Sequence, residues 1–170
     1  MDVRHLKIVL YPNPVLRSKS RAVPQVTTEV RAVARRMLEL MHGAPGVGLA
    51  ANQVGLKVRL FVANPTGVPE DDRVFINPTL QPVGREMEEA EEGCLSIPDV
   101  RGKVRRFKTV VIRALDLDGK PFELTGEDLA ARVWQHEADH LDGVLIIDRM
   151  APLDRLANRK PLRELELAKD

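Results

Sequence analysis

The chain has 170 residues, of which 44% are hydrophobic and 30% are charged. This composition argues against disorder and predicts one folded domain over residues 1–170. The 26 Lys and Arg residues nearly balance the 25 Asp and Glu residues, so we expect neither an anionic membrane nor a sequence-specific nucleic acid as partner. Apolar runs are too short for a membrane span, and the N-terminus lacks a signal-peptide pattern. Together with a single cysteine, Cys94, these features predict a cytoplasmic protein.

The first secondary-structure elements are a turn and a helix. Two prolines within residues 12–18 predict a turn with a short helical piece. From Glu29 to His42 the apolar residues recur at the i, i+3, i+4 spacing of an amphipathic helix. Either Thr27 or Thr28 is suited to cap this helix, and Gly43 to end it.

Short strands follow in the middle of the chain. The β-branched and aromatic runs at 58–62 and 74–76 predict two strands, which we expect to end at the Asn-Pro pairs 64–65 and 77–78. Residues 109–124 predict a β-hairpin whose turn contains Asp118-Gly119, a dipeptide suited to positive φ.

Two further helices are predicted after the hairpin. The first begins near Thr125 with a capping-box-like Asp128, presents Leu129, Val133, His136 and His140 on one face, and ends before Gly143. A charged helix over 154–168, interrupted or restarted at Pro161, belongs to a C-terminal helical tail at about 152–170. The order of the predicted helices and strands along the chain indicates an α+β fold. In this fold, short, mostly antiparallel strands pack around the central His-bearing helix, with one helix in the N-terminal half and one at the C-terminus.

The strongest chemical signal is the H-E-x-x-H motif at residues 136–140. Histidines four residues apart lie on one helix face, so His136 and His140 can bind one metal ion. Glu137 lies between them, where it can act as a general base toward a metal-bound water. The alternative is a pair of core or surface histidines with a solvated glutamate.

A catalytic metal site needs a third protein ligand. Cys94, in the segment Glu92-Gly93-Cys94-Leu95-Ser96, is the best candidate, although a lone cysteine is more often buried and inert. His5 and His42 are competing candidates, but no rigid strand or turn positions either of them.

Two other segments have distinctive compositions. Residues 46–53 combine small residues at 46, 48, 50 and 51 with Gln53, a pattern that suits close approach of a peptide strand. The alternative is a tight strand beneath the helix at 29–42, with Gln53 merely bonding to the backbone. Five glutamates lie between Glu86 and Glu92, and we interpret them as a solvated strand edge or loop.

Together, the segments Gly46–Gln53, Glu92–Ser96 and His136–His140 resemble the three signature blocks of the peptide deformylase family. The resemblance implies a metallohydrolase that removes the formyl group from N-formylmethionyl nascent peptides and releases formate. It also implies one divalent metal ion, Fe(II) or Zn(II), held by Cys94, His136 and His140.

The resemblance further implies roles for other residues. Glu137 would activate the metal-bound water, while the Gln53 amide and the Leu95 backbone N–H would stabilise the oxyanion together with the metal. The substrate backbone would pair near Val47, Gly48 and Gly93, with the methionine side chain close to Val47 and Val133. Arg101 would lie at the mouth of the substrate site, although it could equally be a surface arginine.

One further expectation and two rival functions remain. By analogy with the family, the C-terminal helix could contact the ribosome. A zinc endopeptidase is a rival function, but its third ligand would lie downstream of the helix, where only Asp142 and Asp148 are near enough. A metal-binding module without catalysis is a second rival, and such a protein would need neither Glu137 nor Gln53.

Overall fold

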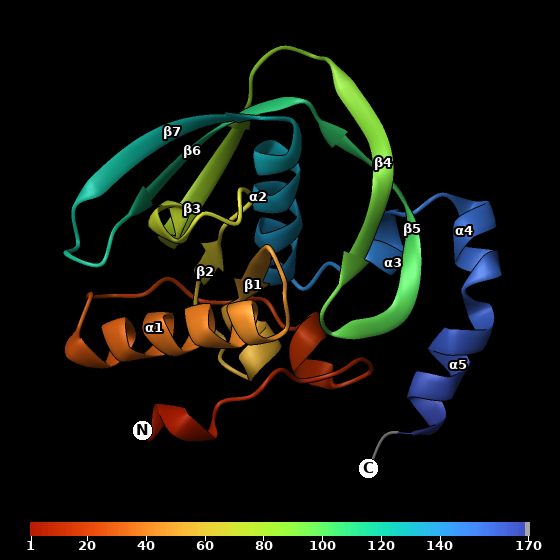
Figure 1. Cartoon of the computed structure of the whole chain (residues 1–170), viewed down its shortest axis with the longest axis horizontal. Coiled ribbons are helices and arrows are strands. Elements are labelled where there is room, and N and C mark those ends of the chain that lie inside the picture. The colour runs from red at the N-terminus through yellow and green to blue at the C-terminus, as the bar shows by residue number, and fades with distance from the viewer. Residues whose placement is uncertain (169–170) are drawn as a thin grey trace.

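A computed structural model describes residues 1–168 and contains seven strands in two antiparallel sheets. The larger sheet has the order β1-β2-β3-β6-β7, and β4 pairs only with β5. The strands are β1 (Gly48–Ala50), β2 (Leu60–Ala63), β3 (Arg73–Pro82), β4 (Met87–Cys94), β5 (Ile97–Phe107), β6 (Thr109–Leu115) and β7 (Pro121–Glu127). The helices are α1 (Thr28–Gly43), α2 (Asp128–Leu141), α3 (Ile146–Arg149), α4 (Pro152–Ala157) and α5 (Arg159–Leu167). Helix α2 lies centrally between the five-stranded sheet and the β4–β5 hairpin (Figure 1), which confirms the predicted α+β architecture.

Helix α1 forms as its periodicity predicts. Thr27 caps it, because the Thr27 side chain accepts a hydrogen bond from the Val30 N–H at 3.2 Å. The apolar side chains Val33, Ala34, Met37 and Met41 are buried in the same core cluster as residues of β1 and β2. Packing of α1 therefore holds the β1 edge of the sheet in place.

The core on the α2 side of the sheet is aromatic. Phe61 of β2 stacks on Phe75 of β3 with ring centroids 4.8 Å apart, and Trp134 of α2 lies 5.7 Å from Phe75. These rings anchor α2 to the sheet over the same stretch of helix that carries the H-E-x-x-H motif.

One strand boundary differs from the predictions. The Asn-Pro pair at 77–78 does not end β3, which continues to Pro82 through a shift in register between Ile76 and Thr79. Asn77 has φ of 51° and its side chain bonds to the backbone of Val23, so it forms a bulge within the strand. The hairpin at 109–124 is confirmed as β6–β7, with Gly119 at φ of 74° in its turn.

The predicted start of α2 was wrong. Thr125 belongs to β7 and pairs with Val111, so it is not available to cap a helix. The helix begins at Asp128, and Glu127 precedes it without a side-chain capping bond. The end is as predicted, because Gly143 follows the helix in a left-handed conformation with φ of 75°.

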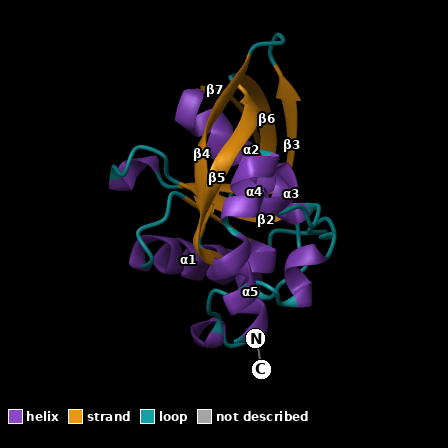
Figure 2. Cartoon of the chain, turned by 90° about the vertical axis from the view of Figure 1, so that its right-hand side faces the viewer, coloured by secondary structure: helices purple, strands orange, loops and turns teal. Residues whose placement is uncertain are grey.

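The C-terminal helix is divided at a different residue from the one predicted. The break between α4 and α5 is at Asn158, whose side chain donates to the Arg101 and Asp154 carbonyls at 2.7 Å each. Pro161 lies in the first turn of α5, where a helix tolerates proline because the N–H there needs no helical partner. Both short helices lie beside β5 (Figure 2). Residues 169–170 of the predicted tail lie outside the described residues.

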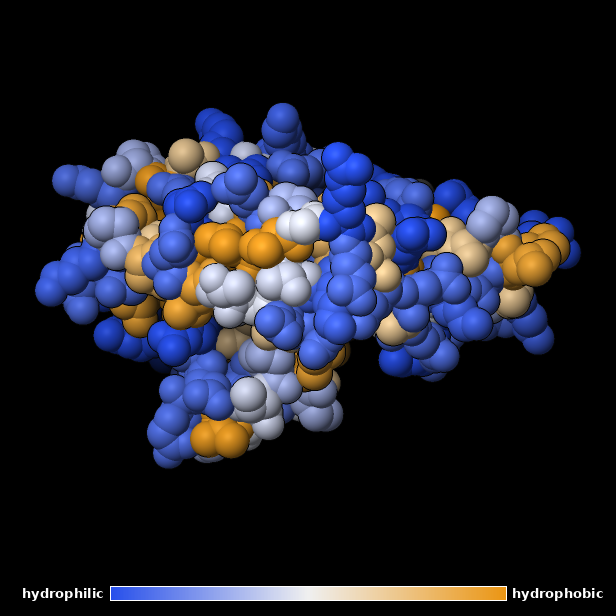
Figure 3. Space-filling view, turned by 90° about the horizontal axis from the view of Figure 1, so that it is seen from above, coloured by the Kyte–Doolittle hydropathy of each residue, from blue (hydrophilic) through white to orange (hydrophobic). Residues whose placement is uncertain are grey.

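Exposed large hydrophobic residues are few and spread over several elements. The face seen from above is largely hydrophilic, with hydrophobic side chains in small patches (Figure 3). Among residues 1–168, no helix is both long enough and apolar enough to cross a membrane.

Candidate metal centre and adjoining cleft

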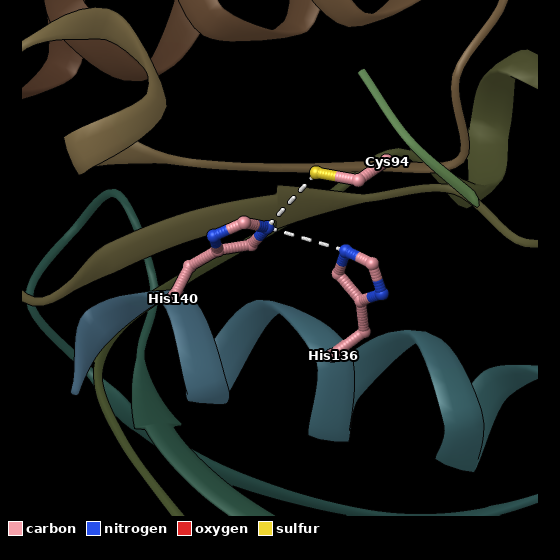
Figure 4. A group of neighbouring side chains, drawn as sticks. All are labelled: Cys94, His136 and His140. Atoms are coloured by element: carbon pink, nitrogen blue, oxygen red, sulfur yellow. Dashed lines mark hydrogen bonds between the residues drawn. The ribbon is translucent and has the colours of Figure 1, made fainter. Parts of the chain in front are cut away.

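The three predicted metal ligands lie together. Figure 4 shows that His136 and His140 project from one face of α2. Their Nε2 atoms lie 3.2 Å apart. Cys94, at the end of β4, places its Sγ 3.4 Å from the His140 Nε2. All three candidate ligand atoms lie within 4.8 Å of one another. The competing candidates, His5 and His42, are exposed and lie beside Asp2 and Asp72 instead.

This arrangement fits a divalent ion. A tetrahedral ion bonded to nitrogen at about 2.1 Å and to sulfur at about 2.3 Å keeps its donors about 3.3–3.6 Å apart. The observed separations of 3.2 and 3.4 Å are close to this range. One thiolate and two imidazoles suit zinc, iron and several other first-row metals. Within residues 1–168, this is the one group of three such side chains with potential to bind a metal.

Glu137 lies beside this group on α2 and is 4% exposed. One carboxylate oxygen, Oε2, is 4.0 Å from the His136 Nε2, and the other, Oε1, is buried without a hydrogen-bond partner. Burial raises the pKa of Glu137 to about 7. A carboxylate with such a pKa can both accept and release a proton near neutral pH.

The sequence pattern does not predict a role for Glu92. The run from Glu86 to Glu92 has the composition of a solvated strand edge or loop, but Glu92 is buried and its Oε1 lies 2.9 Å from the His136 Nδ1. Burial alone would raise the pKa of Glu92, but its hydrogen bonds with Arg106 and His136 hold this pKa well below the ordinary value. Glu92 is therefore ionised and orients the His136 ring.

Arg106 and Arg132 hold the Glu92 carboxylate in turn. Arg106 donates from Nε and Nη2 to the two oxygens of Glu92, both at 2.9 Å, and from Nη1 to Asp139 at 2.6 Å. Arg132 of α2 donates to Glu92 at 2.6 Å. Spacing along the strand does not predict this role, because the register shifts between Gly93 and Cys94 and the two-residue periodicity of a strand face is interrupted there.

Gln53 lies next to the candidate ligands, in a 3-10 turn over Ala51–Val54 rather than at the end of an extended run. Its Oε1 accepts from the Ala50 N–H at 2.9 Å. Its Nε2 is 3.1 Å from the Ser96 Oγ and 3.5 Å from the Cys94 Sγ. The backbone bond therefore fixes the amide with its donor directed toward the site.

A cleft of about 540 Å³ opens beside these residues. Its lining includes every residue predicted to contact substrate: Val47, Gly48, Gly93, Leu95, Arg101 and Val133. At the rim, Arg101 donates to Glu91 at 2.7 Å, and both side chains are exposed. Two of the lining segments are sheet edges: β1 is the outermost strand of the large sheet, and β4 is one of the two strands of the smaller sheet.

Comparisons with known proteins give a consistent result. The family model described as Polypeptide deformylase matches residues 5–156. The peptide deformylase of Acidobacterium capsulatum is 44% identical over 164 residues, which cover 95% of this chain and 95% of that protein. The peptide deformylase of Acinetobacter baumannii is 41% identical over 160 residues, which cover 94% of this chain and 91% of that protein.

Solved structures agree with these sequence relatives. A peptide deformylase from Plasmodium falciparum superposes with a TM-score of 0.90 at 36% identity, covering 95% of each chain. One from Legionella pneumophila gives a TM-score of 0.87 at 38% identity, covering 97% of this chain and 99% of the other. The chain therefore belongs to the polypeptide deformylase family, the metal-dependent hydrolases that remove the N-formyl group from nascent peptides.

Proposed function

We propose that this chain hydrolyses N-formylmethionyl peptides at a single divalent ion, Fe(II) or Zn(II), held by Cys94, His136 and His140. The observation that carries the proposal is the position of the His140 Nε2, which lies 3.4 Å from the Cys94 Sγ and 3.2 Å from the His136 Nε2, beside a buried carboxylate. When bound, the ion supplies positive charge that lowers the pKa of water and polarises the formyl carbonyl. The chemistry adds water across the formyl C–N bond and gives formate and a free amine.

Glu137 is the proposed general base and acid. It takes a proton from the attacking water and later gives that proton to the departing amine nitrogen. Its burial supports both steps, because the raised pKa keeps the protonated and ionised forms close in free energy. Its Oε1 makes no hydrogen bond to the residues around it, so this oxygen is free to accept one from water or substrate.

Gln53 and the backbone N–H of Leu95 are the proposed donors to the formyl oxygen as negative charge develops on it. The Ala50 N–H bond to the Gln53 Oε1 supports this role, because it presets the Nε2 donor before substrate arrives. Loss of one such donor costs about 10²–10³ in turnover in other enzymes. We therefore expect Gln53→Leu to lower kcat by about this factor while metal content stays unchanged. Unaltered turnover would remove Gln53 from the mechanism.

The substrate backbone is proposed to add as a strand in the cleft between β1 and β4. Support comes from the positions of both strands at the edges of their sheets, where Val47–Gly48 and Gly93 line the cleft. The methionine side chain would lie against Val47 and Val133, which both line the cleft. At the mouth of the cleft, Arg101 would break its hydrogen bond with Glu91 and form one with the peptide.

The C-terminal helices are proposed to contact the ribosome, and the protein to act in the cytoplasm, where nascent peptides emerge. Arg159, Lys160 and Arg163 are exposed on α5, and two of them line a groove of about 500 Å³ with Leu156. We expect cosedimentation with ribosomes to be lost on deletion of residues 152–170 and to weaken with added salt. Replacing the three basic residues with Gln is the matched test, because it leaves the buried Leu162 in place. Undiminished cosedimentation of both variants would refute the contact.

The proposed activity is tested with anaerobically purified protein whose metal content is measured on the same sample. We expect formate release from formyl-Met-Ala-Ser, no cleavage of unformylated Met-Ala-Ser, and no formate release by a metal-loaded Glu137→Gln variant. Cleavage that ignores the formyl group would favour an endopeptidase, although Asp142 and Asp148 are already bonded to Arg59 and Arg17. Metal binding without formate release would favour a non-catalytic module.

A further inference from the structure

The carboxylate of Glu137 lies directly against the backbone of β1 at Gly48. A Cβ atom built on Gly48 would lie 2.5 Å from the Glu137 Oε2 and 2.9 Å from both its Cδ and its Cγ. These separations are shorter than any normal contact, so a side chain at position 48 and the present Glu137 conformation exclude each other.

Backbone freedom does not explain this glycine. Gly48 is absent from the positive-φ glycines, which are Gly55, Gly67, Gly84, Gly119 and Gly143. Its backbone is an ordinary strand that pairs with Ala63 of β2, and an L-residue can adopt such a conformation without strain. What Gly48 provides is the space that a methyl group would otherwise fill.

Glu137 has little freedom to move away from a larger residue. The side chain is almost fully buried, and three of its atoms, not only its tip, lie within 3 Å of the point that a Cβ on Gly48 would occupy. Restoring an ordinary contact of 3.4 Å or more would require the carboxylate to shift by about 1 Å. A misplacement of about 1 Å in a reacting group can cost about 10² in rate.

We propose that Gly48 is a positioning residue. Because it has no side chain, it leaves the space in which the Glu137 carboxylate is placed for proton transfer. This inference rests on the proposed function of Glu137 as the base. The neighbouring Gly46 has a parallel but separate effect, because a Cβ there would lie 2.6 Å from the Leu95 Cδ1. The two glycines therefore make room for different parts of the site.

The test is a double-mutant cycle between Gly48→Ala and Glu137→Ala. We expect Gly48→Ala to lower kcat by about 10² with KM changed less than about threefold and with metal content retained. Glu137→Ala removes the Cγ, Cδ and Oε2 atoms that the new methyl group would meet. In the Glu137→Ala background, Gly48→Ala should therefore change the residual kcat by less than about threefold. If the two losses instead multiply, the added methyl group acts by obstructing substrate and the inference is wrong.

Two alanine variants are matched controls. Gly46→Ala introduces the same methyl group against Leu95, so Glu137→Ala should not relieve its effect on kcat. Gly43→Ala introduces it where, apart from the adjacent residues and the helix's own backbone, no atom of residues 1–168 lies within 4 Å, so kcat and KM should match the unmodified protein. If Glu137→Ala relieved the Gly46→Ala loss, the relief would reflect a general loosening of the site and not space made for one carboxylate.

A stability measurement covers the case in which Gly48→Ala folds poorly. The Tm of the metal-free protein is then measured, and Glu137→Ala should restore the Tm that Gly48→Ala lowers, because all three closely placed atoms are removed. An unrestored Tm would overturn the inference. Full turnover of Glu137→Gln would instead refute Glu137 as the base. If Glu137→Gln is inactive and the kcat losses in the double-mutant cycle multiply, only the positioning role of Gly48 is refuted.

Discussion

The β4–β5 hairpin carries two arginine–carboxylate pairs of similar chemistry, one of which is buried and the other exposed to solvent. Glu92 and Arg106 have side chains that are 5% and 4% exposed, whereas those of Glu91 and Arg101 are 58% and 62% exposed. Glu91 and Glu92 are consecutive residues of one strand, so their side chains point to opposite faces. One face is packed against α2 and the other is in solvent.

The difference shows that burial, not residue type, decides which ion pair can serve the candidate metal centre. The buried Glu92 bonds to His136, Arg106 and Arg132. Removing its charge weakens the ionic pairing of the buried Arg106, which still bonds to Asp139, and of the partly buried Arg132, which still bonds to two backbone carbonyls. The exposed Glu91 bonds only to Arg101, and water can replace either partner. Substitutions at the two glutamates should therefore differ in stability and in metal affinity.

The largest effect is expected from Glu92→Gln. Breaking a buried ion pair costs about 3–5 kcal/mol, and loss of a carboxylate that orients a metal-binding histidine costs about 10–100-fold in metal affinity. Urea unfolding of the metal-free protein measures the first quantity, and competition with a chelator measures the second. If the variant bound metal as tightly as the unmodified protein, Glu92 would be structural only.

An intermediate effect is expected at Asp148, which pairs with Arg17 and is 31% exposed. Burial alone would raise the pKa of Asp148, but hydrogen bonds from Arg17 and the Leu145 N–H lower it below the ordinary 3.8. The ionised form therefore stabilises the fold at pH values above 3.8, and this contribution disappears as the pH falls through 3.8 and below.

The corresponding measurement compares Asp148→Asn with the unmodified protein by urea unfolding of the metal-free forms. The difference in free energy of unfolding should be constant between pH 7 and pH 5 and should shrink below about pH 4. A difference that grew on acidification would mean that the sign of the pKa shift is wrong.

The smallest effect is expected from Glu91→Gln, the neighbouring control for Glu92→Gln. An exposed pair contributes about 0–1 kcal/mol, and salt screens it. Metal affinity should be unchanged, since Glu91 does not bond to a candidate ligand. If Glu91→Gln lowered the free energy of unfolding or the metal affinity as much as Glu92→Gln, the two faces of the strand would not differ in the way proposed.

The same distinction explains what the sequence could and could not predict. His136, Glu137 and His140 were predictable because helical periodicity alone puts the histidines on one face. Cys94 was predictable as the third ligand because it is the single cysteine in a chain with an H-E-x-x-H motif. The family resemblance strengthened that prediction, since no local pattern brings β4 to α2. Glu92 was missed because a run of glutamates looks solvated unless each side of the strand is considered separately.

The boundaries that the sequence mispredicted have similar causes. Asn77-Pro78 is a breaker signal, but side-chain bonds from Asn77 to the Val23 backbone convert the break into a bulge. Thr125 looked like a helix cap, but pairing with Val111 keeps it in β7. In both cases contacts distant in sequence outweigh a local preference that a short window can detect.

Anomalous diffraction from crystals of the anaerobically metal-loaded protein tests the central claim most directly. The account predicts one peak bonded to the Cys94 Sγ and to the Nε2 atoms of His136 and His140, at about 2.0–2.4 Å. A peak that lacked the Cys94 sulfur, or one coordinated by the downstream carboxylates Asp142 or Asp148, would contradict it.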